Sequence, residues 1–129
     1  MDRLLVDTSS REQMVNITTP TQGLVSQRGW HDGVLTLFCP HTSAAVVLSE
    51  GNDPAVGTDL LRNLSRLLPR DAGYIHPGNP DAHLKSIMVG QSVQILVEQG
   101  CLLLGSWQGV FFCEFDGPRP REVWVKFKA

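Results

Sequence analysis

The segment Tyr74 to Lys85 constrains the fold more than any other stretch, because two prolines and a glycine stand close together in it. Pro77 and Pro80 fix φ and lack an amide donor, while Gly78 allows backbone conformations that residues with a Cβ avoid. The segment is therefore predicted to be a rigid loop, neither helix nor strand. The loop is expected to turn imidazole, amide and carboxylate groups inward, namely those of His76, Asn79, Asp81 and His83.

A third histidine is expected to join this loop. His41 follows an apolar strand candidate that ends at Pro40. Three histidines near a carboxylate commonly hold a divalent metal with one position left open, and the predicted ion is zinc, manganese or magnesium. The spacing of seven between His76 and His83 is not a helical metal-binding signature. A surface loop whose histidines bond backbone groups is therefore the alternative.

Length and composition narrow the class of protein. The 129 residues predict a single domain, 1–129, that buries a core without disulfides. A net charge of −2 and a pI near 6.0 argue against nucleic acid as a partner, since no basic stripe is present. Cys39, Cys101 and Cys113 form no C-x-x-C pair, which fits reduced thiols in a cytoplasmic protein. No apolar run reaches the ~20 residues that cross a bilayer, and no signal peptide pattern is present, so no membrane partner is expected.

Hydrophobic patterns predict an α+β fold. The clearest helix has Asp53 as N-cap and Pro54 at its first position, and an earlier one is predicted to begin with Thr19 as N-cap. Strands are predicted over residues 3–7, 13–17, 33–39, 42–48, 92–97, 101–104, 107–115 and 121–128. Together these predict about eight mostly antiparallel strands in a two-sheet, β-sandwich-like core with two inserted helices.

Further details of pairing and burial follow from the same patterns. Strand 92–97 is expected to form a hairpin with 101–104, and strand 107–115 a second hairpin with 121–128. The strands 33–39 and 42–48 are expected to be covered on both faces, and the apolar run Val110 to Cys113 to lie in a sandwich interior or a subunit interface. Residues 84–89 are expected to form a helical turn.

Five motifs of the chain together resemble the YjbQ-like family, also called the secondary thiamine-phosphate synthase family. They cover nearly the whole chain, in the family's order: His41-Thr42-Ser43-Ala44, Glu50 to Pro54, Gly78 to Ser86, Gly105 to Gly109 and Phe112 to Arg119. The resemblance implies a sandwich-like α+β protein that assembles as a homotrimer, with these motifs near the subunit interfaces. It also implies a histidine-rich site suited to a metal ion, and a weak thiamine-phosphate synthase activity. Ser49 is a departure, because family members tend to have asparagine there.

Under this catalytic hypothesis the metal ligands are His41, His76 and His83, and the metal acts as a Lewis acid on a phosphate oxygen. Glu50 and Asp81 are expected to orient the imidazoles or to move protons. The expected catalytic group is therefore His41, Glu50, Asp81 and His83.

The implied reaction joins a thiazole phosphate to a pyrimidine pyrophosphate as pyrophosphate leaves, so the site must neutralise anionic oxygens. Lys85, Arg119 and Arg121 are the candidate cations. Trp107 is expected to stack on a planar heterocycle while Gln108 reads its edge. The expected substrate contacts are Ser43, Asn79, Lys85, Trp107, Gln108 and Arg119.

Two other functions fit the same residues. A non-catalytic homotrimer that binds a metal or a small anion would gain thermal stability from its ligand without turnover. A metal-dependent phosphohydrolase would release phosphate from simple esters and would lose that activity in His83→Ala. Fold alone does not choose among the three, because function depends on the site.

Overall fold

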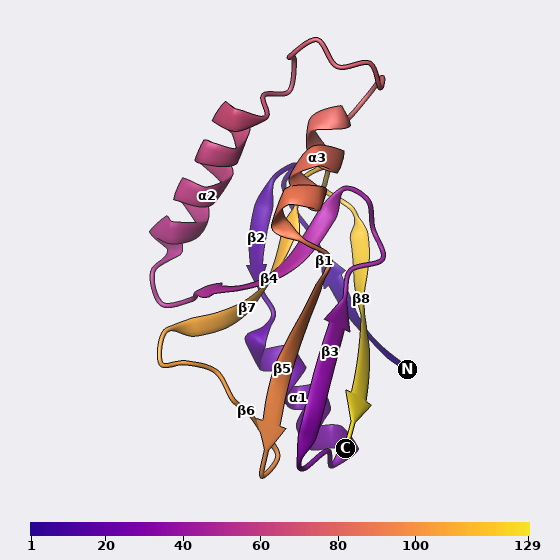
Figure 1. Cartoon of the computed structure of the whole chain (residues 1–129), viewed down its shortest axis with the longest axis vertical. Helices are drawn as coiled ribbons and strands as arrows, with labels where there is room; N and C mark the ends of the chain where they lie inside the picture. The colour runs from indigo at the N-terminus through magenta and orange to yellow at the C-terminus, as the bar shows by residue number, and fades with distance from the viewer.

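The computed structural model describes residues 1–129 as two antiparallel β-sheets and three helices (Figure 1). The elements follow the chain as β1 (Asp2–Asp7), β2 (Gln13–Asn16), α1 (Thr18–Arg28), β3 (Gly33–Phe38), β4 (Ala44–Glu50), α2 (Pro54–Leu67), α3 (Pro80–Val89), β5 (Ser92–Glu98), β6 (Cys101–Leu102), β7 (Gln108–Glu114) and β8 (Pro120–Lys128). The predicted α+β class, with eight strands in two sheets, is confirmed. None of the helices has the length and apolar character that a bilayer crossing requires.

The main core lies between the two sheets. The larger sheet has the strand order β1-β8-β3-β5-β6, and the smaller has the order β2-β7-β4. Alternate residues of each strand point to one face of a sheet, so Leu35 and Leu37 of β3 meet Val46 of β4 and Phe112 of β7 in one buried cluster. This alternation is what the strand patterns of the sequence encode.

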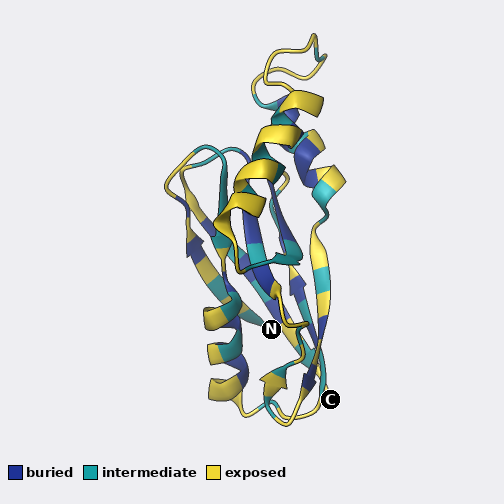
Figure 2. Cartoon of the chain, turned by 90° about the vertical axis from the view of Figure 1, so that its left-hand side faces the viewer, coloured by how far each residue is buried: buried dark blue, intermediate teal, exposed yellow.

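The smaller sheet is buried on its second face as well. A separate cluster joins Ala45 and Cys113 of the sheet to Leu64 of α2 and Ala82 of α3. This explains why residues 110–113 are apolar on both sides: one side faces the larger sheet and the other faces the helices. Leu64 is the single fully buried residue of α2, and Figure 2 shows the rest of that helix mostly at the surface.

The prediction that Tyr74 to Lys85 is entirely a loop is wrong in its second half. Pro80 begins α3, a full helix of ten residues, so the fold has three helices rather than two. A proline is tolerated at the first helical position because the amide there has no intrahelical acceptor in any case. The rule that proline breaks a helix applies only to later positions.

The second predicted hairpin is also wrong. β7 pairs with β2 and β4, whereas β8 pairs with β1 and β3 in the other sheet. The turn at residues 115–119 therefore carries the chain from one sheet to the other. The first hairpin, β5 with β6, is confirmed.

Two smaller expectations need correction. Thr19 is not an N-cap, since α1 begins at Thr18 with Ile17 as its N-cap, and Asn16 accepts hydrogen bonds from Thr18. β3 is not covered on both faces, because Phe38 is 41% exposed on the open face of the larger sheet, where it stacks on Trp124. Asp53 is the N-cap of α2, as predicted, and accepts from the amide of Ala55 at 3.0 Å.

Candidate functional site

His83 lies on α3 with one ring nitrogen engaged. Its Nδ1 is 2.8 Å from the carbonyl oxygen of Thr42. A carbonyl only accepts, so Nδ1 carries the proton, and in the neutral ring Nε2 keeps a free lone pair. His83 therefore has the tautomer that a metal ligand or a general base needs.

His76 is the nearest histidine to His83. The ring centroids are 5.1 Å apart and the ring planes meet at 74°. Both rings line a hollow of about 360 Å³, here called the histidine hollow, together with Tyr74, Ile75, Pro80 and Leu84. His76 of the segment before α3 and His83 of α3 therefore lie side by side.

His41 faces elsewhere. Its Nε2 lies 3.1 Å from the backbone nitrogen of Glu122 on β8, and its ring meets Phe112 edge-on at 6.4 Å. Burial and the nearby Arg121 guanidinium hold the pKa of His41 below its ordinary value, which keeps the ring neutral. The ring of His41 is therefore held against β8 and β7 of the two sheets.

The three-histidine metal site expected from the sequence is not assembled within one chain. No group of three His, Cys, Asp or Glu side chains lies in an arrangement that could hold a metal ion. The pair His76 and His83 offers two imidazoles. A complete site would need a further donor from outside this chain.

Asp81 and Lys85 lie in a buried ion network rather than at an open site. Lys85 Nζ lies 3.0 Å from Asp81 and 2.8 Å from Glu12, and Arg11 forms a second ion pair with Asp81 at 3.1 Å. Burial alone would raise the pKa of Asp81, but hydrogen bonds from Arg11 and Lys85 outweigh it and lower that pKa. Lys85 is 1% exposed, so its expected contact with substrate oxygens is replaced by contacts with carboxylates.

Ser43 and Arg121 belong to a second buried network. Arg121 donates from Nε to Glu114 at 2.9 Å and from a terminal nitrogen to Ser43 Oγ at 2.8 Å. Glu114 also accepts from Thr8 at 2.7 Å. Arg121 was a candidate cation for the substrate, and the structure commits it to Glu114 inside the protein.

Asn79 and Arg119 both contact Asp116. Asn79 Nδ2 donates to Asp116 Oδ2 at 2.7 Å, and an Arg119 guanidinium nitrogen lies 3.1 Å from the same oxygen. The side chain of Arg119 is 48% exposed. Arg119 is thus the one candidate cation that reaches the surface, and it does so with its charge already balanced.

Glu50, Trp107 and Gln108 lie at the other end of β4. Glu50 accepts from the amides of Asn52 and Asp53 at 2.7 and 3.1 Å, and it is the register partner of Gln108 on β7. The side chain of Trp107 beside it is 64% exposed. This group is here called the Glu50 end.

β4 separates the predicted site residues into two groups. Ser43 precedes its first residue and Glu50 is its last, with seven residues in the strand. At roughly 3.3 Å per residue, the two groups are about 20 Å apart. No single ligand of ordinary size spans this distance on one chain.

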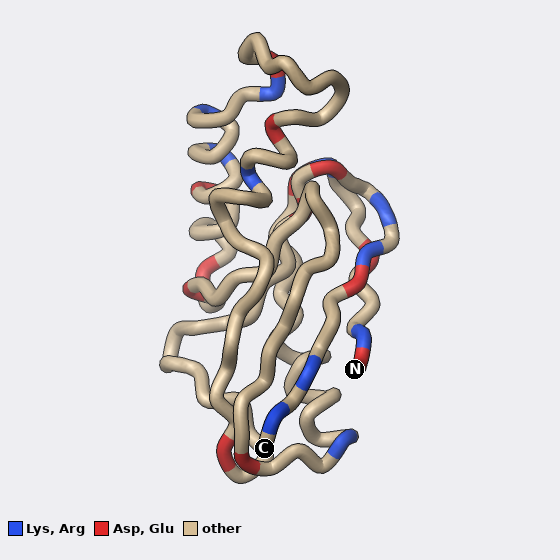
Figure 3. Tube along the Cα trace, turned by 45° about the vertical axis from the view of Figure 1, so that its right-hand side comes forward, with Lys and Arg blue, Asp and Glu red and all other residues tan.

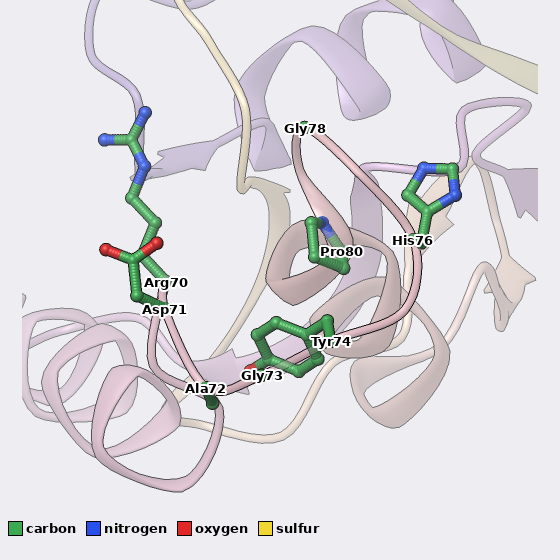
Figure 4. A pocket seen from close by; sticks show the side chains of 8 residues that line it. All are labelled: Arg70, Asp71, Ala72, Gly73, Tyr74, His76, Gly78 and Pro80. Carbon is green, nitrogen blue, oxygen red and sulfur yellow. The ribbon is translucent and has the colours of Figure 1, made fainter.

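Some residues of the site were not found from the sequence. The sequence indicates no role for Arg11, Glu12 or Arg70, because each acquires its environment from elements distant in sequence. Arg70 lines a second hollow, and Figure 4 shows that His76 lines the opposite side of the same hollow. The spacing of residues along the sequence does not reveal that these side chains lie at the site.

The chain is similar to known proteins over nearly its whole length. A family profile described as UPF0047 protein YjbQ-like matches residues 2–129. The UPF0047 protein MJ1081 of Methanocaldococcus jannaschii is 43% identical over 122 residues, which cover 94% of this chain and 88% of that protein. UPF0047 protein YugU of Bacillus subtilis is 39% identical over 125 residues, covering 95% of both.

Solved structures agree with the fold. A YjbQ/UPF0047 family protein of Clostridium acetobutylicum superposes with a TM-score of 0.95 at 42% identity, covering 99% of this chain and 100% of that one. Protein TT1486 of Thermus thermophilus superposes with a TM-score of 0.92 at 45% identity, with the same coverage. The two-sheet architecture with its three helices is therefore shared with these proteins.

Proposed function

The chain belongs to the UPF0047 (YjbQ-like) family, and we propose that it is a metal-assisted enzyme acting on a small phosphorylated molecule at the histidine hollow. The observation that carries the proposal is the fixed tautomer of His83. Its Nδ1 donates to the Thr42 carbonyl, which leaves Nε2 free beside His76. A hydrogen bond of this kind commonly orients a metal-ligating histidine.

His76 and His83 would hold the metal. Two imidazoles in one hollow fit a zinc or manganese ion better than magnesium, which prefers oxygen ligands. When bound, the ion supplies Lewis-acid polarisation of a phosphate oxygen. The chain's own contribution is to fix the His83 ring against Thr42, and Ile75 and Leu84 line the hollow beside the two imidazoles.

The reaction we propose is of the thiamine-phosphate synthase type, on the strength of the family resemblance. A thiazole phosphate joins a pyrimidine pyrophosphate, and pyrophosphate leaves. Both substrates are anionic, which suits a site with a divalent cation. We place this activity in the cytoplasm, where the free thiols of Cys39, Cys101 and Cys113 would stay reduced.

We further propose that the site is completed in a homotrimer, where the histidine hollow of one chain meets the Glu50 end of its neighbour. The separation of about 20 Å between the two groups along β4 supports this arrangement. So do the exposed apolar side chains near the hollow, since Ile75, Ile87 and Met88 are 103%, 73% and 58% exposed. Such residues are often covered in an oligomer.

The test of the metal site is elemental analysis of protein purified without a metal-affinity tag. We expect near-stoichiometric zinc or manganese per chain, its loss in His83→Ala, and its retention in His31→Ala, since His31 is exposed and pairs with Asp32. Unchanged metal content in His83→Ala, or no metal binding after reconstitution of the wild type, would remove the proposal. Thermal stabilisation by ligand without any turnover would instead favour the non-catalytic binding protein.

A further inference from the structure

The segment between α2 and α3 makes very few bonds to the rest of the protein. From Arg70 to Gly78 no backbone amide donates a hydrogen bond to a protein acceptor. The hydroxyl of Tyr74 donates to the carbonyl of Pro69 at 2.6 Å, which is a contact within the segment. The amides of this segment are therefore free to bind a ligand.

Arg70 differs from the other cations around the site. Arg11, Lys85, Arg119 and Arg121 each form an ion pair with a carboxylate. Arg70 forms none, although Asp71 is its neighbour in sequence. Of these five cations, Arg70 is the one that forms no ion pair with a carboxylate.

Arg70 and His76 line the same hollow, which has a volume of about 230 Å³. Figure 4 shows them on opposite sides of it, with Gly78 and Pro80 between. The histidine hollow shares Tyr74, His76 and Pro80 with this one. A ligand held at the histidines can therefore extend one end toward Arg70.

The chemistry of this hollow suits a phosphate group. A guanidinium offers a planar fork of donors that matches two phosphate oxygens, and free backbone amides add further donors. Figure 3 shows acidic and basic positions interspersed along the chain, so no broad positive field attracts anions. Recognition of an anion must then come from a particular cation.

We propose that Arg70 binds the phosphate or pyrophosphate group of the ligand held at the histidine hollow. This inference rests on the proposed function and adds to it the residue that recognises the anion. Arg70 takes the role of anion-binding cation that was expected of Lys85 and Arg121. Those two side chains are paired with carboxylates inside the protein. Asp71, which lines the same hollow, accepts from a hydroxyl or amino group of that ligand.

The test is calorimetric titration with inorganic pyrophosphate of the wild type and of Arg70→Gln, Arg66→Gln and His83→Gln. Arg66 is the matched control, because it is an exposed arginine of α2 without an ion pair and lies outside both hollows. We expect Arg70→Gln to weaken binding by about tenfold or more, as the loss of a charged bidentate contact should, and Arg66→Gln to change it by less than about twofold.

The outcomes separate this inference from the proposed function. If Arg70→Gln binds pyrophosphate as tightly as the wild type while His83→Gln binds it more weakly, the role of Arg70 is overturned. The proposed histidine site is then unaffected. A loss of the same size in Arg70→Gln and Arg66→Gln shows a general charge effect and also overturns it. Absence of pyrophosphate binding by the wild type refutes the anion site, whereas the metal content of the protein tests the histidines independently.

Discussion

Lys85 Nζ lies 3.0 Å from the carboxylate of Asp81, one turn earlier on α3, and both side chains are almost fully shielded from water. Glu12, from the connection between β1 and β2, and Ser65 of α2 also contact the ammonium group. One buried lysine thus joins three segments of the chain. It also fixes the helix that carries His83.

Replacing Lys85 by methionine should destabilise the protein strongly. The variant removes this cation from Asp81, which is shielded from water, and from the partly exposed Glu12. Breaking a buried ion pair costs about 3 kcal/mol or more. Urea denaturation measures the loss of unfolding free energy. Lys126→Met is the control, because that lysine of β8 is exposed and its removal should change stability by less than about 0.5 kcal/mol. Equal stability of the two variants would contradict the structural role of Lys85.

Stability should fall at acid pH because of Glu114 and Asp81. Burial alone would raise the pKa of Glu114, but Arg121 and Thr8 donate hydrogen bonds that hold this pKa below its ordinary value, as Arg11 and Lys85 do for Asp81. A folded-state pKa below the unfolded one contributes stability that is complete above the unfolded pKa, at about pH 4, and is lost as pH falls through the folded pKa.

Urea denaturation at pH 6 and pH 3 checks this. The wild type should lose unfolding free energy between the two pH values. Glu114→Gln should be less stable than the wild type at pH 6. It should lose less unfolding free energy than the wild type between pH 6 and pH 3, because glutamine does not titrate. An equally large loss in the variant would show that Glu114 is not one of the groups responsible.

Mixing two inactive variants should restore activity if the site is shared between subunits. His83→Ala and Glu50→Gln should each abolish turnover in the pure variant, because each removes one side of every site. In trimers reassembled from a 1:1 mixture, about a quarter of the sites should combine an intact His83 with an intact Glu50 from the neighbour. Pyrophosphate release measures the recovered activity. A mixture as inactive as the pure variants would show that the two residues do not share a site between chains.

Local signals predicted much of the fold. β-branched and aromatic runs located the strands to within a few residues, and Asp53 followed by Pro54 marked the start of α2. These features depend on neighbours in sequence, since strand propensity and capping act over a few residues. The same holds for the motifs that resemble the family, whose profile matches nearly the whole chain.

The failures share a physical cause. Pro80 was interpreted as a loop residue because local rules do not distinguish the first helical position from later ones without knowing where the helix begins. β7 and β8 were paired because a short turn links them, yet β7 fills the centre of the smaller sheet and β8 lies between β1 and β3 of the larger. Sheet membership depends on which apolar faces meet, which is a property of the whole chain.

The sequence by itself determined the fold class, the strand positions and the gathering of His76 and His83 in one short segment. Only the tertiary structure decided which charges are available. It buried Lys85 and Arg121 against carboxylates, turned His41 to the backbone of β8, and left Arg70 without a partner. A titratable side chain is recognisable by type in the sequence, but its role depends on burial and on partners that can be more than a hundred residues away, as Thr8 is 106 residues from Glu114.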